Sequence, residues 1–366
     1  MMSASSGNRI RNNILTLAAA ALLAVSLWLA PKYLDGYKIR IINLIAINAI
    51  LGLSLNLIYG MAGMFSLGHA GFMAIGAYVS ALLILTPEQK SMMWILDPIA
   101  PWLLNLHAPF YVSLLLAGIA AAFFGWLISL PILRLGGDYL GIATLGFSEI
   151  LRILIANLTP ITNGPIGLKG IPAHTNLWVS YGCLLVLLIA VIRLMGSNFG
   201  NVMRAVRDDE IAAETMGINT FRTKALAFTI GCFGAGVGGA LMGNIITTID
   251  AKMFTITQTY NILMIVVIGG LGSITGSILG SVIITTMLEW LRFVENPITI
   301  GAFKMDGKPG MRMVIFSILL VAVIIFRREG IMGMREFSWD WILSRPAAIR
   351  NRFASGETPK GGDLNG

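Results

Sequence analysis

Residues 41–60 have the sequence IINLIAINAILGLSLNLIYG, which contains no acidic or basic side chain. About twenty apolar residues are the length that an α-helix needs to cross the hydrocarbon core of a bilayer. A glycine-rich turn at residues 60–64, also uncharged, joins this stretch to a second apolar run at residues 65–85. Two such runs in direct succession predict a pair of membrane-spanning helices, and the rest of the chain repeats the pattern.

The composition agrees with a membrane protein and excludes several other classes. The chain has 366 residues, of which 56% are hydrophobic and 12% charged, and its mean hydropathy is +0.79. Soluble domains are about 45–50% apolar and about 25% charged, so this chain has too few charges to cover a water-facing surface. An ordinary cytosolic enzyme, a disordered protein and a disulfide-rich secreted scaffold are excluded. Cys183 and Cys232 lie within apolar stretches, and we interpret both as small core residues.

The apolar runs predict an all-α polytopic membrane protein with about ten transmembrane helices. The run at 258–270 is too short to span alone, and it could be a tilted helix, a half-helix or part of a re-entrant element. The first run follows Arg9 and Arg11 and resembles a signal peptide, but we favour an uncleaved first helix because apolar runs continue at once. The runs lie at 14–30, 41–60, 65–85, 109–133, 139–157, 177–195, 225–249, 258–270, 273–294 and 311–326.

The distribution of basic residues predicts that both termini lie in the cytoplasm. An even number of spans places both ends on one side, and cytoplasmic loops carry an excess of Lys and Arg. Arg327 and Arg328 directly follow the last run, and a long charged loop lies near residue 200, whereas the basic loop at 31–40 opposes this assignment. Because the basic residues lie in short segments between apolar runs, they indicate topology and not nucleic-acid binding.

The chain is predicted to form a transmembrane domain at residues 1–330 and a cytoplasmic tail at 331–366. Aromatic residues among charges at 335–345 predict an interfacial helix, and the polar end after residue 354 is predicted to be disordered. Glycines four residues apart within the apolar runs predict close helix packing. Glycine- and serine-rich segments at 63–77 and 269–281 resemble each other, which makes two repeated halves plausible.

Catalytic and metal-binding motifs are absent from the sequence. It contains no GxxxxGK[ST], HExxH or GxSxG pattern, and its three histidines, His69, His107 and His174, are far apart. We therefore expect no enzymatic activity, no metal and no cofactor. Energy for transport would have to come from a partner subunit or from an ion gradient.

The longest charged stretch within the body of the chain is NVMRAVRDDEIAAETMGIN at residues 201–219. We expect Asp208 to cap a short helix there and Gly217 to end it. Its small apolar face, which includes Ile211 and Met216, would suit a groove on another protein. The alternative is an ordinary solvated loop helix.

Residues 204–219 resemble the cytoplasmic loop of bacterial branched-chain amino-acid ABC transporter permeases. Three further stretches resemble motifs of the same family in the same order, over residues 45–290. The version seen here resembles the LivM-type subunit of the permease pair. These stretches are SLGHAGFMAIGAY at 66–78, GDYLGIATLGFSEILR at 137–152 and GGLGSITG at 269–276.

The resemblance implies the permease subunit of an importer for leucine, isoleucine or valine in the bacterial inner membrane, surrounded by lipid. Its implied partners are a second homologous permease subunit in a heterodimer, two ABC ATPase subunits and an extracytoplasmic substrate-binding protein. An ATPase subunit would dock on a coupling loop at residues 196–224. ATP would be bound and hydrolysed in the ATPase subunits and not in this chain. The implied docking residues are Arg204, Arg207, Asp208, Asp209, Glu210, Ala212, Ala213, Glu214, Met216 and Gly217.

A second group of candidates could line the translocation path. Glu149 lies about 15 Å into its run, near mid-bilayer, and can pair with Arg152 three residues later. The pair is either a neutralised structural feature or a contact for a zwitterionic substrate. Polar residues such as Asn43 could likewise form interhelical hydrogen bonds or line a conduit. The candidate path residues are Asn48, Asn56, His69, Thr144, Ser148, Glu149 and Arg152.

Two other functions stay open from the residues alone. One is a urea or amide ABC importer permease, since related permeases share these motifs. The other is an ion-coupled secondary amino-acid transporter with Glu149 as its coupling carboxylate, which would not need the loop at 201–219. The loop at 163–172, NGPIGLKGIP, could contact the substrate-binding protein or be only a stiff connection.

Overall fold

In the computed structural model the chain is helical, as the apolar runs predict, with two small two-stranded sheets among the described residues. The structure describes residues 6–94, 98–135, 137–295, 298–300, 303–305 and scattered residues between 310 and 336. The chain divides into two units, residues 35–335 and residues 1–34 with 336–366, and each is described by itself. In the second of these, α1 (Ser6–Tyr33) contains an apolar stretch at Ile14–Tyr33 that is long enough to cross a membrane.

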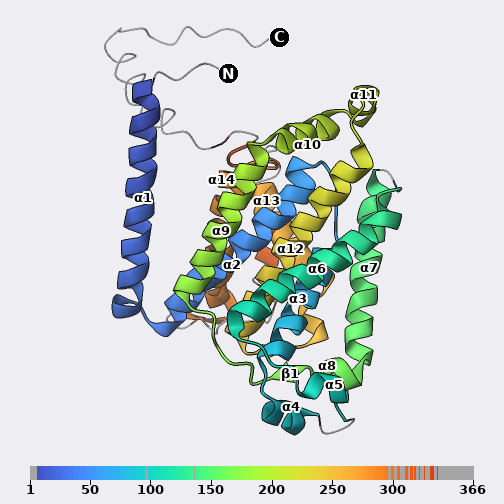
Figure 1. Ribbon diagram of the computed structural model, residues 1–366. Coiled ribbons are helices and arrows are strands. Elements are labelled where there is room, and N and C mark those ends of the chain that lie inside the picture. Colours follow the sequence, from blue (N-terminus) through green and yellow to red (C-terminus); the bar gives the residue numbers. More distant parts are fainter. Residues whose placement is uncertain are drawn as a thin grey trace. The chain divides into compact units, whose positions relative to one another are not determined.

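The unit at residues 35–335 is a bundle of helices joined by short connections (Figure 1). Its long helices are α2 (Gly36–Asn56), α3 (His69–Ile84), α6 (Phe110–Ile132), α7 (Asp138–Asn157), α9 (Leu177–Met195), α12 (Thr220–Ile246), α13 (Ile256–Gly269) and α14 (Ile274–Trp290). The shorter helices are η1 (Leu57–Met61), α4 (Pro87–Met93), α5 (Pro101–Leu104), α8 (Thr159–Thr162), η2 (Gly164–Ile166), α10 (Asn198–Asp208), α11 (Glu210–Thr215), η3 (Ala251–Met253) and η4 (Leu291–Glu295). The strands are β1 (Leu168–Lys169), β2 (Thr248–Ile249), β3 (Ile298–Ile300) and β4 (Phe303–Met305).

The connections gather at two opposite ends of this bundle (Figure 1). At one end α4, α5 and α8 lie near β1, which pairs antiparallel with β2 through Leu168 and Ile249. At the other end α10 lies across the helix ends and α11 follows it. We call the first the β1 end and the second the α10 end. The glycine turns at residues 60–64 and 269–273 both lie at the α10 end, since Gly63 and Gly272 each lie against Arg207 of α10.

The core forms where α12 crosses α3 and α6, and glycines allow the backbones to touch. A Cβ atom on Gly76 of α3 would lie 2.1 Å from the carbonyl oxygen of Gly236 on α12, and one on Gly239 would lie 2.0 Å from the carbonyl oxygen of Met73. Gly276 and Gly269 make a similar mutual approach between α14 and α13. Without hydrophobic driving force in lipid, such close contact is what holds helices together. The predicted role of the spaced glycines is confirmed at these positions.

Seven described helices are long and apolar enough to cross a membrane, or eight if the bent pair α3 and α4 counts as one span. The short run at 258–270 belongs to a stretch at Ala251–Gly269 that has membrane length, while α14 is shorter. The total of ten spans therefore stays a prediction, as do the cytoplasmic termini and the repeated halves. Most of the run at 311–326, the helix expected at 335–345 and the end after 354 lie outside the described residues.

Candidate functional site

The charged stretch at 201–219 forms two short helices at the α10 end of the bundle (Figure 1). Ser197 caps α10 by accepting a hydrogen bond from the backbone N–H of Gly200 at 3.4 Å. Gly200, Met203 and Val206 recur every three residues and are buried, so one face of α10 packs on the bundle. The helix is thereby fixed to the ends of α9 and α12, which it joins.

The cap of α11 differs from the sequence-based expectation. Asp208 does not cap it, because Asp208 is the last residue of α10 and its Oδ1 accepts hydrogen bonds from Arg207 at 2.8 and 3.0 Å. Asp209 is the N-cap instead, and its Oδ1 accepts from the backbone N–H of Ala212 at 3.0 Å. Gly217, with φ +80°, follows the helix end as predicted.

Both carboxylates of α11 bind neighbouring side chains, whereas the two large apolar side chains at this helix are highly exposed. Glu210 pairs with Lys224 of α12, and Glu214 accepts a hydrogen bond from the Thr220 hydroxyl at 2.7 Å. By contrast, Ile211 is 77% exposed and Met216 is 82% exposed. Ala212 is exposed and Ala213 is buried. We call Ile211 and Met216 the apolar tip of α11.

Two arginines of α10, three residues apart, bind different parts of the bundle. Arg204 donates to the carbonyl oxygen of Met195 at the end of α9, at 3.1 Å, and to Asn201 at 3.3 Å. Arg207 donates to the carbonyl oxygen of Gly60 at 3.2 Å. Gly60 belongs to η1, a π-helical turn that continues α2, and such turns are frequent at functional sites.

Glycines on both sides make room for Arg207. A Cβ atom on Gly63, which has φ +73°, would lie 2.8 Å from the Arg207 Cγ atom, and one on Gly272 would lie 3.3 Å from its Nη1 atom. Asn56 holds the second turn in place: its Oδ1 accepts from the N–H of Gly272 at 2.8 Å, and its Nδ2 donates to the Ser273 carbonyl oxygen at 2.8 Å. We call this arrangement of Arg207, the two glycine turns and Asn56 the arginine junction.

The other polar residues of α2 form hydrogen bonds to neighbouring helices. Asn48 donates to Thr285 of α14 at 2.8 Å, and Asn56 donates to Ser277 of the same helix at 2.8 Å. Asn43 accepts from Ser180 of α9 at 2.8 Å. The structure therefore shows the interhelical hydrogen bonds that the sequence offered as one of two explanations.

His69, Thr144 and Ser148 lie on the contact of α3 with α2 and α7. The His69 Nε2 atom is 3.0 Å from the Ser54 hydroxyl, while its buried Nδ1 atom has no hydrogen-bond partner. Thr144 accepts from the N–H of Leu67 at 3.0 Å, which joins α7 to the turn before α3. Ser148 is buried where it meets Gly71 of α3.

Glu149 and Arg152 lie on another side of α7 and form the ion pair that their spacing predicts. Arg152 donates to Glu149 Oε1 through both Nε and Nη2, with the Nε bond at 2.9 Å. The side chains are still 46% and 27% exposed, respectively, within the membrane-length stretch Tyr139–Asn157. The candidate path residues thus form two groups: a buried or partly buried set on α2, α3 and α7, and this half-exposed pair.

Two arrangements were not predicted from the sequence: the arginine junction and the buried Lys90. The arginine junction joins positions 216 residues apart, Asn56 and Gly272, and the glycine-rich turns were the signal that could have suggested it. Lys90 of α4 is fully buried, and its Nζ donates to the carbonyl oxygens of Leu103 and Leu106, for which the sequence gives no signal. Among the described residues, no group of three His, Cys, Asp or Glu side chains could hold a metal ion.

Several known proteins are similar to this chain over most of its length. The high-affinity branched-chain amino acid transport system permease protein LivM of Escherichia coli (strain K12) is 31% identical over 370 residues, which cover 91% of this chain and 78% of the relative. The corresponding LivH protein of the same organism is 26% identical, with 79% and 92% covered. A probable branched-chain amino acid transport permease protein LivM of Methanocaldococcus jannaschii is 24% identical, with 77% and 89% covered. No solved structure matches the chain.

The protein family described as branched-chain amino acid transport system, permease component, matches residues 37–324, which include all the long helices of the bundle. Together with helices of membrane length, these relatives make the chain a multi-pass protein of the inner membrane. The chain belongs to the family of permease components of branched-chain amino acid transport systems.

Proposed function

We propose that this chain is the permease subunit of an ABC importer that carries leucine, isoleucine or valine into the cell. The observation that carries the proposal is the match over residues 37–324 combined with the exposed α10–α11 segment at one end of the bundle. ATP hydrolysis would take place in partner subunits, and this chain would supply half of the transmembrane pathway. A homologous permease, two ATPase subunits and an extracytoplasmic substrate-binding protein would complete the importer.

The apolar tip of α11 is the proposed ATPase contact. Ile211 and Met216 are among the most exposed large apolar side chains of the described residues, and they project from a segment whose polar groups bind each other. Burying a Met or Ile side chain contributes about 1.5–3 kcal/mol. We therefore expect the apolar tip to supply binding energy for the ATPase, while the neighbouring charged side chains stabilise the conformation of α11.

The arginine junction is the proposed link from the ATPase to the transmembrane helices. Because Arg207 binds Gly60 and contacts the Gly272 turn, a displacement of α10 acts on the ends of α2 and α14 at once. Arg204 connects α10 to α9 separately. Closure of the ATPases would move α10, and the junction would pass that movement into the bundle.

The ion pair on α7 is proposed to face the second permease subunit or the pathway between the two. A charge in the middle of a bilayer costs about 2.5–3.5 kcal/mol on insertion scales. Glu149 and Arg152 offset part of that cost by pairing, yet both stay partly exposed in the isolated chain. Covering this side of α7 with protein or with a water-filled path removes the remaining cost.

The substrate-binding protein is proposed to dock at the β1 end, on the loop at 163–172. Asn163 takes a left-handed conformation and donates to the carbonyl oxygen of Gly167 at 2.9 Å, which fixes the loop. Ile166 and Lys169 are exposed on it. The urea importer and the secondary transporter are not favoured, because the named relatives are branched-chain amino acid permeases.

Transport in liposomes tests the function. The chain is reconstituted with its candidate partner permease, ATPases and binding protein, and uptake of labelled leucine is measured with and without ATP. We expect ATP-dependent uptake of leucine that unlabelled isoleucine and valine reduce. Uptake that follows a proton gradient without ATP would contradict the ABC mechanism, and competition by urea alone would contradict the substrate class.

A double variant tests the docking contact. The variant is Ile211→Lys with Met216→Lys, which changes only side chains exposed to solvent. Reversing the charges of Asp209, Glu210 and Glu214 would be less specific, because it would also disturb the N-cap of α11 and the hydrogen bonds of its carboxylates. The variant should lose the ATPase subunits on co-purification. Ile166→Lys, an exposed apolar residue at the opposite end, is the matched control and should retain them. Retention by the double variant would refute the contact.

A further inference from the structure

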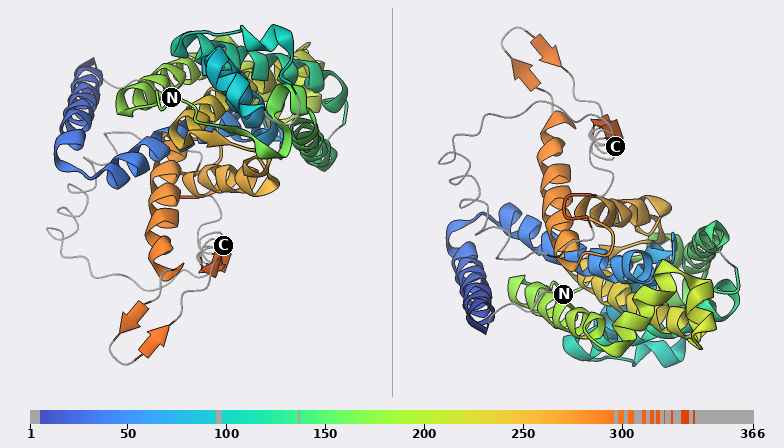
Figure 2. Two further views of the ribbon diagram at one scale, coloured as in Figure 1. Left: turned by 90° about the horizontal axis from the view of Figure 1, so that it is seen from below. Right: turned by 90° about the horizontal axis from the view of Figure 1, so that it is seen from above.

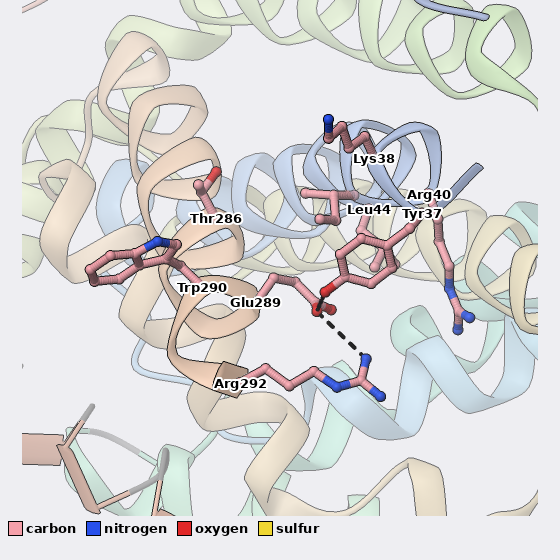
Figure 3. Close-up of a pocket in the computed structure, with 9 residues that line it drawn as sticks. Tyr37, Lys38, Arg40, Leu44, Thr286, Glu289, Trp290 and Arg292 are labelled. Carbon is pink, nitrogen blue, oxygen red and sulfur yellow. Dashed lines mark hydrogen bonds and ion pairs between the residues drawn. The ribbon is translucent and has the colours of Figure 1, made fainter. Parts of the chain in front are cut away.

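A pocket of about 1070 Å³ lies between the start of α2 and the end of α14 (Figure 3). Tyr37 from α2 donates a hydrogen bond to Glu289 Oε2 at 2.8 Å across it. Both end views show α14, in orange, beside α2 and α13 (Figure 2). The arginine junction holds the opposite ends of α2 and α14, so the pocket lies at the other membrane surface.

The rim of the pocket is positively charged. Lys38, Arg40 and Arg292 line it, with Glu289 as the acidic lining residue. Glu289 already binds Tyr37 and lies 3.9 Å from Arg292, while Lys38 lies 3.7 Å from Asp35. Arg40 has no acidic partner within ion-pair distance among the residues that the structure describes. Lys38 and Arg292 thus each lie near a carboxylate, and Arg40 leaves a surplus of one positive charge that suits an anionic group.

The lining of the pocket changes from charged to apolar along α2, from the start of the helix toward its middle. Lys38 and Arg40 lie in the first turns of α2, whereas Ile41 and Leu44 line the pocket further into the span. Trp290 and Tyr37 flank the charged rim, which is the position that aromatic residues prefer at a membrane surface. A charged rim above an apolar groove has the polarity of a lipid molecule and not of a small water-soluble anion.

We propose that this pocket binds an anionic phospholipid, with its phosphate on Arg40 and Arg292 and an acyl chain along Ile41 and Leu44. Arginine forms paired hydrogen bonds to phosphate oxygens, and its planar guanidinium suits phosphate recognition better than a lysine ammonium does. The site accounts for the basic loop at 31–40, which opposes the positive-inside pattern. It does not depend on the solute that the permease carries.

Native mass spectrometry of the purified full chain with phosphatidylglycerol or phosphatidylcholine tests the site. At the contribution typical of a basic residue near an anionic membrane surface, Arg40→Gln with Arg292→Gln should weaken the preference for phosphatidylglycerol about thirty-fold. Lys169→Gln with Lys252→Gln is the matched control, because both lysines are exposed at the same end and the charge loss is equal. The control should keep the wild-type preference.

Two further arms identify the ligand. Arg40→Lys with Arg292→Lys retains the charge without the paired geometry, so it should fold and bind phosphatidylglycerol with intermediate strength. Inorganic phosphate should not displace the lipid, since it lacks the acyl chain. Equal lipid preference in the pocket and control variants would overturn the proposal. Displacement of the lipid by inorganic phosphate would overturn it as well.

Discussion

Replacing Arg207 by glutamine should separate ATPase attachment from transport. The Arg207 side chain is 21% exposed, and its hydrogen bond to the Gly60 carbonyl oxygen is 3.2 Å long. A hydrogen bond to a charged group contributes about 1.5–3 kcal/mol. If that energy passes the movement of α10 to α2 and α14, its loss should reduce leucine uptake at least about tenfold.

The attachment of the ATPases should survive this change. Met203 and Val206 still pack the buried face of α10, and Arg204 still binds the carbonyl oxygen of Met195. The apolar tip of α11 is untouched. The ATPase subunits should therefore co-purify with the Arg207→Gln variant and hydrolyse ATP at a basal rate that substrate no longer stimulates.

Arg204→Gln provides the matched control, because it removes the same charge one helical turn away. It breaks the contact of α10 with the end of α9 and leaves the arginine junction intact. Uptake and substrate-stimulated ATPase activity are measured in the same liposomes for both variants. Equal losses in the two variants, or detachment of the ATPases by Arg207→Gln, would refute the view that Arg207 is the link.

Three other experiments test the bundle. Gly76→Ala should destabilise the bundle by about 1–3 kcal/mol through overpacking, since its methyl group would meet a carbonyl of α12 at 2.1 Å, and its thermal midpoint in detergent should fall. Gly146→Ala is the control, because its methyl group would meet open space and should leave the midpoint unchanged. Asn56→Ala removes three hydrogen bonds, to α14 and to the turn before it, and Asn48→Ala removes one. At about 0.6 kcal/mol each the first should destabilise about three times more, and equal losses would contradict this. Exchanging Glu149 with its ion-pair partner should preserve folding but reduce uptake, and full uptake would show that the pair only neutralises itself.

The fold class followed from the sequence because bilayer thickness fixes the length of a spanning helix. Each apolar run of that length appears as a helix where the structure describes it, and the glycine turns fall where the sequence puts them. The order of the helices in space could not be obtained in this way. Most runs are apolar on every side, so periodicity does not show which face meets which neighbour.

The short helical segment at the candidate site was predictable from the sequence, but its contacts were not. The motif at 204–219 identified the segment at the α10 end, yet the N-cap was assigned to Asp208 in place of Asp209. The local reason is Arg207, which binds the Asp208 carboxylate and leaves Asp209 as the extended residue between two helices. No local pattern shows that Arg207 reaches Gly60, because that contact spans 147 residues of sequence.

The hydrogen bonds of α2 indicate which parts of the bundle move together. Tyr37, Asn48 and Asn56 of α2 each bind α14 directly, near one end, in the middle and near the other end. Sliding these two helices past each other would break all three bonds at once, so α2 and α14 form one rigid pair. The arginine junction contacts this pair of helices at the α10 end, and the proposed lipid pocket lies between them at the other end. Under the proposed mechanism, we therefore expect a displacement of α10 to move α2 and α14 together.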